Sequence, residues 1–163
     1  MPIPMECERR FLVTGEEWRH NVHLCHRIRQ GYLSSAEGVT VRVRVMGERA
    51  YLTIKTLGDG IARSELEYEI PADHGEFLLR TACGRQTVEK LRHDVTVDGF
   101  VWSVDEFHGL NQGLVLAEIE LDRADRPLPL PIWVGPEVTT THRFHNSALS
   151  RHPFSLWQDR RLA

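Results

Sequence analysis

Acidic and basic side chains in this sequence are sorted by segment and recur at every second position. The acidic sets are Glu6 and Glu8; Glu65, Glu67 and Glu69; and Glu118 and Glu120. The basic sets are Arg42 and Arg44, and Lys90 and Arg92. On a β-strand, a spacing of two directs every member of a set to the same face.

This sorting decides what kind of face the strands present. One such strand is typical of a sheet with a dry and a wet face. A wet face, however, normally mixes both signs with neutral polar residues, because cross-strand pairing favours opposite charges. Carboxylates at one place and cations at another suit an anion neutralised by Mg²⁺ or Mn²⁺, which also bind phosphate oxygens. Guanidinium and ammonium groups bind the phosphates themselves. The pattern therefore predicts a pocket for a polyphosphate.

Composition limits the other function classes. The chain has 163 residues, 41% of them hydrophobic, so we expect one domain spanning residues 1–163. A net charge of −3 argues against a nucleic-acid partner. No apolar stretch approaches the roughly 20 residues of a membrane helix, and the first residues do not resemble a signal peptide. Three widely spaced cysteines indicate a reducing compartment, so we expect a cytoplasmic protein without a membrane partner.

Alternating apolar and polar residues predict the elements that position these charges. The segments with this period are 6–13, 26–33, 38–47, 51–56, 64–70, 88–97, 100–107 and 116–122. Asp98-Gly99 is typical of a hairpin turn between two of them. Short helices are predicted at 15–21, capped by Thr14, at 74–83 and at 145–152. The proline-rich segment 125–133 is predicted to be an extended connector. We therefore expect a mainly β (α+β) fold, a closed eight-stranded antiparallel barrel with a few helices outside.

The same residues carry a resemblance that extends nearly from end to end. "ECERR" is similar to the N-terminal E-x-E-x-K signature of the CYTH domain family, of the triphosphate tunnel metalloenzyme superfamily. "IRQGYL", "VRVRV", "YLTIKT", "RSELEYEI", "VEKLRH", "VDEFHGLNQGLVLAEIEL" and "EVTTTHRFHNSAL" follow in the family's order. The resemblance implies an eight-stranded β tunnel that hydrolyses or cyclises triphosphates with a divalent metal.

The resemblance also implies a role for individual residues. The metal carboxylates would be Glu6, Glu8, Glu118 and Glu120. The phosphate chain would be held by Arg10, Arg42, Arg44, Lys55, Arg92 and Arg143. Catalytic positions would be Glu65, Glu67, Lys90, Asp105 and His142, with the two glutamates near a second metal or the attacking water.

Two positions depart from the family pattern. Arg10 stands where the signature has lysine, and His142 stands where the C-terminal segment has lysine. Arginine keeps the charge but does not readily exchange a proton, and histidine carries a charge only when protonated. These changes affect the expected rate and substrate choice rather than the expected fold.

The leading hypothesis is metal-dependent hydrolysis of inorganic triphosphate or a related short polyphosphate, with Mg²⁺ or Mn²⁺ as cofactor, by a monomer or homodimer. Alternatives are an organic triphosphatase acting on a nucleoside or thiamine triphosphate, an adenylyl cyclase, and a non-catalytic polyphosphate or nucleotide sensor. The segment 20–26 gathers three histidines and a cysteine, but their spacing is unlike a standard zinc motif and favours a surface or packing role.

Overall fold

The protein is described from a computed structural model, in which residues 5–36, 38–56 and 62–159 are placed. Its strands are β1 (Met5–Val13), β2 (Val22–Ala36), β3 (Val39–Met46), β4 (Arg49–Thr56), β5 (Ala62–Ile70), β6 (Thr87–Val97), β7 (Phe100–Phe107), β8 (Val115–Glu120) and β9 (Val134–Glu137). Its α-helices are α1 (Ala72–Thr81) and α2 (Asn146–Leu149), and 3₁₀ helices occupy Glu17–Asn21, Gly109–Asn111, His142–Phe144 and Phe154–Leu156.

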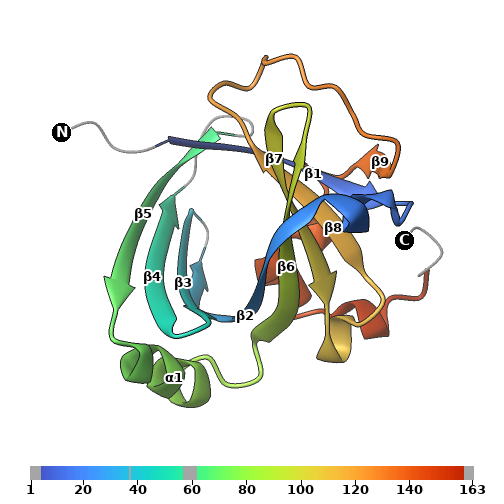
Figure 1. Cartoon of the computed structure of the whole chain (residues 1–163). Coiled ribbons are helices and arrows are strands. Elements are labelled where there is room, and N and C mark those ends of the chain that lie inside the picture. Colours follow the sequence, from blue (N-terminus) through green and yellow to red (C-terminus); the bar gives the residue numbers. More distant parts are fainter. Residues whose placement is uncertain (1–4, 37, 57–61, 160–163) are drawn as a thin grey trace.

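Within the described residues, the nine strands form one sheet in the order β5-β4-β3-β2-β6-β7-β8-β1-β9. Every neighbouring pair is antiparallel, as the alternation predicted. The first residues of β1, 5–7, pair instead with residues 62–64 of β5, at the far end of the strand order. In Figure 1, β1 accordingly spans from β5 to β8 along one end of the strongly curved sheet.

Alternation gives the sheet two different faces. Phe11, Trp102 and Trp133 belong to an apolar cluster outside the sheet, where the rings of Trp102 and Trp133 meet edge to face at 5.6 Å. A second cluster joins β1, β7 and β8 to the C-terminal segment through Phe144 and Trp157. The four tryptophans of the chain are predicted to pack outside the strands, and each of them is buried. The other face of the strands carries the charged sets.

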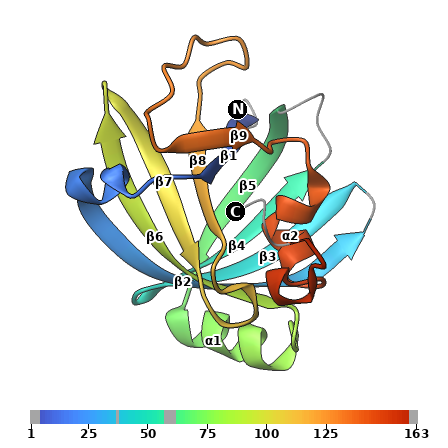
Figure 2. The ribbon, with the colours of Figure 1, turned by 90° about the vertical axis from the view of Figure 1, so that its right-hand side faces the viewer.

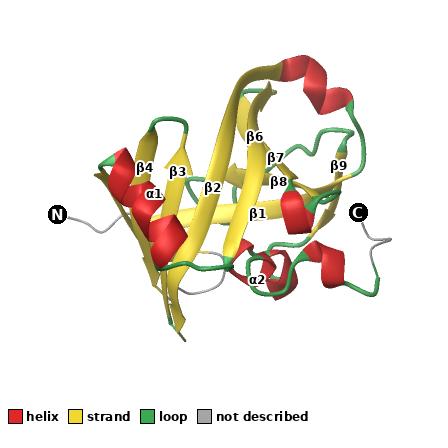
Figure 3. Cartoon of the chain, turned by 90° about the horizontal axis from the view of Figure 1, so that it is seen from below, coloured by secondary structure: helices red, strands yellow, loops and turns green. Residues whose placement is uncertain are grey.

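Helix α1 covers the outside of β3 and β4 (Figures 1 and 3). Its Leu79 belongs to the same apolar cluster as Val43, Val45 and Ala50. Gly75 permits this close approach, because a Cβ atom at its position would lie 2.5 Å from the Cβ of Ala50. The helix follows Pro71 and begins at Ala72, before the predicted start at residue 74, and it ends at Thr81, before the predicted limit at residue 83.

The turn between β6 and β7 follows the sequence signal. Asp98 and Gly99 both have positive φ, 50° and 78°, which is the conformation of a two-residue hairpin turn.

Three local predictions were wrong in detail. The segment after Thr14 forms a 3₁₀ helix that begins at Glu17, and Thr14 does not cap it. The hydroxyl of Thr14 lies instead 3.5 Å from the carbonyl oxygen of Trp133. The sheet has a ninth strand, β9, which was missed because it is short, contains Pro136 and directly follows the proline-rich connector.

None of the helices in the described part of the chain combines the length and the apolar character needed to cross a membrane.

Candidate functional site

The charged faces of the strands surround a cavity of about 410 Å³. Its lining comes from β1 to β6, from β8 and from the segment after β9. The lining residues are Glu8, Arg10, Gln30, Tyr32, Thr40, Arg42, Arg44, Lys55, Glu65, Glu67, Lys90, Arg92, Glu118, Glu120, Thr139, Thr140, His145, Asn146 and Ser147.

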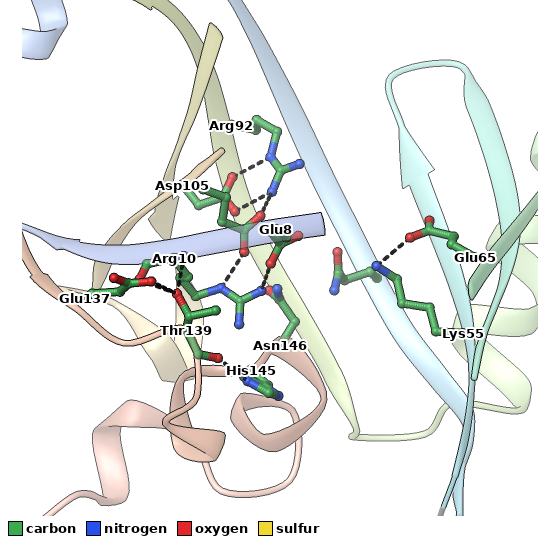
Figure 4. A network of polar contacts seen from close by, with 12 residues as sticks. Glu8, Arg10, Lys55, Glu65, Arg92, Asp105, Glu137, Thr139, His145 and Asn146 are labelled. Atoms are coloured by element: carbon green, nitrogen blue, oxygen red, sulfur yellow. Dashed lines mark hydrogen bonds and ion pairs between the residues drawn. The ribbon is translucent and has the colours of Figure 1, made fainter. Parts of the chain in front are cut away.

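Strands β1 and β8 bring the first acidic set together. Glu8 lies opposite Glu120 and Arg10 lies opposite Glu118 in the ladder, so the alternating residues of both strands share one face. The Nε of Arg10 donates to Oε1 of Glu118 at 2.8 Å, and its Nη2 donates to Glu8. Figure 4 shows the Arg10 guanidinium beside the carboxylate of Glu8.

Strands β6 and β7 add a buried ion cluster next to this acidic set. Asp105 is fully buried and accepts two hydrogen bonds from Arg92, each of 2.7 Å. It also accepts a bond from Lys90, which is 2% exposed. Arg92 extends the cluster to β8 by donating to Oε2 of Glu118. Asp105 therefore fixes the two cations of β6 at the cavity wall.

Burial and neighbouring charges perturb several pKa values in this region. Burial lowers the pKa of Lys90 to about 8, although Asp105 acts in the opposite direction. Burial also disfavours ionisation of Glu118, but Arg10, Arg92 and Lys90 outweigh it and hold the pKa of this carboxyl well below its usual value. Glu118 therefore stays ionised in the folded protein.

Glu120 differs from Glu118. Partial burial raises the pKa of Glu120, and the nearby carboxylates of Glu8 and Glu65 raise it further. Lys55 and Arg92 act in the opposite direction without outweighing these effects, so negative charge at the end of β8 is only partly compensated. A cation at this place would relieve the repulsion.

The opposite wall is formed by β3, β4 and β5. Arg42 and Arg44 contact Glu67 at 3.3 and 2.9 Å, and Lys55 contacts Glu65 at 2.6 Å. Figure 4 shows the Lys55–Glu65 pair across the site from Arg10 and Arg92. The Nε atoms of Arg42 and Arg44 are buried without a hydrogen-bond partner among the described residues. Burial of such donors is costly, so these two side chains fit an oxygen-rich anion in the cavity.

The segment after β9, which Figure 2 shows continuing into α2 beside the sheet, contributes residues to the lining of the cavity. The backbone N–H of Arg10 donates to Oγ1 of Thr139 at 3.0 Å, and the Nε2 of His145 lies 3.1 Å from the carbonyl oxygen of Thr139. Lys90 reaches Oδ1 of Asn146 at 3.3 Å. Thr139 and Asn146 of this segment therefore add uncharged hydrogen-bonding groups next to the cations.

Most of the residues assigned a role by the resemblance meet in this cavity. The side chain of Glu6 lies outside the described part of the structure. Asp105 lies behind Lys90 and Arg92. His142 and Arg143 are placed elsewhere: His142 is exposed, and the Arg143 guanidinium stacks 4.5 Å from the ring centre of Trp157. Neither of these two belongs to the described lining.

Sequence reasoning did not assign several lining residues. Gln30 and Tyr32 point inward from β2, and Gln30 donates to the Tyr32 hydroxyl at 2.9 Å. Burial raises the pKa of Tyr32 to about 12, so it remains a neutral phenol. Period two within β2 was the available signal for this pair. Thr139, His145 and Asn146 had no such signal, because their segment has no regular period.

The carboxylates that line the cavity are suitable ligands for a divalent metal. Glu8, Glu118 and Glu120 supply carboxylate oxygens, which hard divalent cations prefer, and the crowding of negative charge at Glu120 favours a cation there. Within the described residues, however, no three acidic, histidine or cysteine side chains are already arranged as a metal site. The set therefore fits a cation that shares its coordination with substrate oxygens, as Mg²⁺ commonly does.

Comparison with known proteins extends these observations. The CYTH domain family matches residues 4–150. An inorganic triphosphatase of Acetivibrio thermocellus is 40% identical over 154 residues, which are 94% of this chain and 98% of that protein.

Solved structures agree with this match. The structure of the inorganic triphosphatase NE1496 is 33% identical and covers 89% of this chain and 93% of its own, with a TM-score of 0.62. A putative adenylate cyclase from Bacillus halodurans is 15% identical and covers 77% of this chain and 84% of its own, with a TM-score of 0.60, which supports the fold alone. The chain belongs to the CYTH domain family.

Proposed function

We propose that this protein hydrolyses inorganic triphosphate to diphosphate and phosphate with Mg²⁺ or Mn²⁺. The observation that carries the proposal is the charge arrangement of one cavity, in which carboxylates of β1 and β8 adjoin cations of β3, β4 and β6. The relative at 40% identity bears the name inorganic triphosphatase, which supports the same substrate. The family is metal-dependent, whereas the choice of ion is part of the proposal.

The proposal includes a closed tunnel. Pairing of residues 5–7 of β1 with residues 62–64 joins β5, the first strand of the order, to the last strand but one and supports closure around the cavity. A closed wall would present cations to the phosphate chain from several sides, so that most of the substrate's oxygens meet a fixed donor.

In this mechanism the protein acts mainly by positioning and by neutralising charge, because phosphoryl transfer leaves little covalent chemistry to the enzyme. Arg42, Arg44 and Lys55 would bind phosphate oxygens from one wall. Lys90 and Arg92, held by Asp105, would bind from the other wall and stabilise the charge that develops on the leaving group.

The carboxylates of the cavity have a different role from the cations, which is to bind the metal and to orient water. Glu8, Glu118 and Glu120, together with Glu6, would hold a divalent cation that neutralises phosphate oxygens and makes bound water more acidic. Glu65 and Glu67 lie on the opposite wall and would orient the attacking water toward the terminal phosphorus.

The test is product analysis by ³¹P NMR on purified protein with tripolyphosphate and Mg²⁺ or Mn²⁺. We expect equal amounts of diphosphate and phosphate at early times. ATP and thiamine triphosphate in parallel reactions distinguish an organic triphosphatase, and cyclic AMP with diphosphate would indicate a cyclase. Binding of tripolyphosphate without any product would contradict the proposal and favour a sensor.

A further inference from the structure

Arg10 forms ion pairs with two of the carboxylates that are assigned to the metal. Its side chain is buried, its Nε donates to Oε1 of Glu118 at 2.8 Å, and its Nη2 donates to Oε1 of Glu8. One guanidinium thus bridges the acidic residues of two adjacent strands. The contact is favoured by register, because Arg10 lies directly opposite Glu118 in the ladder and two residues from Glu8 on the same face.

The second oxygen of Glu118 is also engaged. Arg92 donates to Oε2 of Glu118, so that both oxygens of this carboxylate face a guanidinium. A divalent cation that binds Glu118 and Glu8 must displace Arg10 from at least one of them. Displacement into a buried site without another partner would be costly, because Arg10 cannot release its proton.

We propose that Arg10 is an internal counter-ion of Glu8 and Glu118 that couples metal binding to triphosphate binding. This inference rests on the proposed function, because triphosphate supplies the oxygens that accept hydrogen bonds from Arg10 when its guanidinium leaves the carboxylates. The vacated oxygens of Glu8 and Glu118 would then be available to hold the metal. Each ligand therefore binds weakly alone and more tightly in the presence of the other, by the same factor.

The geometry of arginine is what makes this exchange specific. The guanidinium uses two differently directed N–H groups for two carboxylates, and the same planar fork matches phosphate oxygens. A lysine ammonium at this position is a compact point charge and does not present that fork. The backbone of Arg10 is held independently of its side chain, since its N–H donates to Oγ1 of Thr139 and its carbonyl accepts from the N–H of Val138.

The experiment measures Mn²⁺ binding to the full chain without triphosphate, by the loss of the electron paramagnetic resonance signal of free Mn²⁺. Arg10→Gln should bind Mn²⁺ about 5- to 150-fold more tightly than the wild type, the usual range of a coupling between sites. Arg10→Lys should also bind more tightly than the wild type, because it keeps the charge and loses the bridge. Arg9→Gln is the matched control: it removes the same charge one residue away, where Arg9 pairs with Glu137 outside the cavity.

A second readout uses imidotriphosphate, a nitrogen-bridged analogue that resists hydrolysis. Isothermal titration with and without Mg²⁺ should show that the metal strengthens analogue binding more in the wild type than in Arg10→Gln. Circular dichroism establishes that each variant is folded, and if Arg10→Gln is not, Arg10→Lys decides the question alone. Mn²⁺ affinities equal to that of the wild type in the folded Arg10 variants would overturn the proposal. So would an equal gain in Arg9→Gln, which would indicate a general effect of charge. Failure of the proposed function is separate, since it appears as absence of product from wild-type protein in the NMR assay.

Discussion

Replacing Asp105 with asparagine should destabilise the protein while preserving the shape of the side chain. Asp105 is fully buried and is the shared acceptor of Lys90 and Arg92. Removing one partner of a buried ion pair typically costs about 3–5 kcal/mol. Two features favour the lower end of this range. Arg92 keeps Glu118 as a partner. Lys90, whose pKa is already lowered to about 8 beside Asp105, can release its proton at pH 7 in the variant at a cost of no more than about 1 kcal/mol.

We therefore expect Asp105→Asn to lower the free energy of unfolding by about 3 kcal/mol, equivalent to a fall of about 6–12 °C in Tm for a chain of this size. Urea denaturation and calorimetry measure it. Asp94→Asn is the matched control on β6, because Asp94 is partly exposed and its contacts are long: the Ser103 hydroxyl lies 3.5 Å and Nε2 of His26 lies 3.9 Å from its carboxylate. A Tm change of Asp105→Asn no larger than that of Asp94→Asn would refute the reasoning.

The same variant has a distinct pH dependence of stability. The pKa of Lys90 is lowered from 10.5 to about 8 in the folded protein, so the unfolded chain binds more protons between these values. Wild-type stability should therefore gain a contribution that rises with pH over this window. In Asp105→Asn, folded Lys90 loses its proton at lower pH, so this gain begins below pH 8. The difference in unfolding free energy between variant and wild type should then narrow between pH 7 and pH 9.

Three further predictions concern activity. In the free enzyme Lys90 loses its charge above about pH 8, so kcat/KM for triphosphate should fall above this pH. Lys90→Arg should shift the fall to higher pH, and identical pH–rate profiles of the variant and the wild type would contradict this. Arg42→Gln should raise KM about 10- to 150-fold, the equivalent of 1.5–3 kcal/mol for a charged hydrogen bond, whereas Arg49→Gln, at an exposed pair with Glu69, should leave KM unchanged. Asn146→Ala should lower kcat/KM because Asn146 contacts Lys90, and His142→Ala should not; the reverse order would show that His142 reaches the substrate.

Strand positions and the charged faces could be predicted from the sequence, because both depend on period two. The sorting of charge by strand also has a structural consequence that the sequence alone did not specify. Arg42 and Glu67 lie on different strands, with Thr53 of β4 opposite each, and Arg10 lies opposite Glu118. Acidic and basic side chains of nearby strands therefore form ion pairs across the sheet.

The part of the cavity lining that follows β9 could not be predicted in the same way. Residues 138–147 follow this short strand and contain the 3₁₀ helix His142–Phe144, and neither element has a period that reveals the direction of a side chain. The resemblance assigned roles to His142 and Arg143, whereas the chain direction brings His145 and Asn146 to the lining. Proline in β9 likewise concealed a strand that is recognised only by its pairing with β1.

The most direct test of the central claim is metal-dependent release of phosphate from tripolyphosphate by three proteins. Glu120→Gln removes one carboxylate at the crowded acidic site without changing its size, and Glu69→Gln removes a carboxylate that is paired with Arg49 on the exposed end of β5. We predict that the wild type and Glu69→Gln release phosphate rapidly with Mg²⁺ or Mn²⁺ and release none after the metal is removed with EDTA. For Glu120→Gln we predict that kcat falls by at least about 100-fold, as it does when one group that stabilises a transition state is removed. Equal rates for Glu120→Gln and the wild type would contradict the assignment of this cavity as the catalytic site.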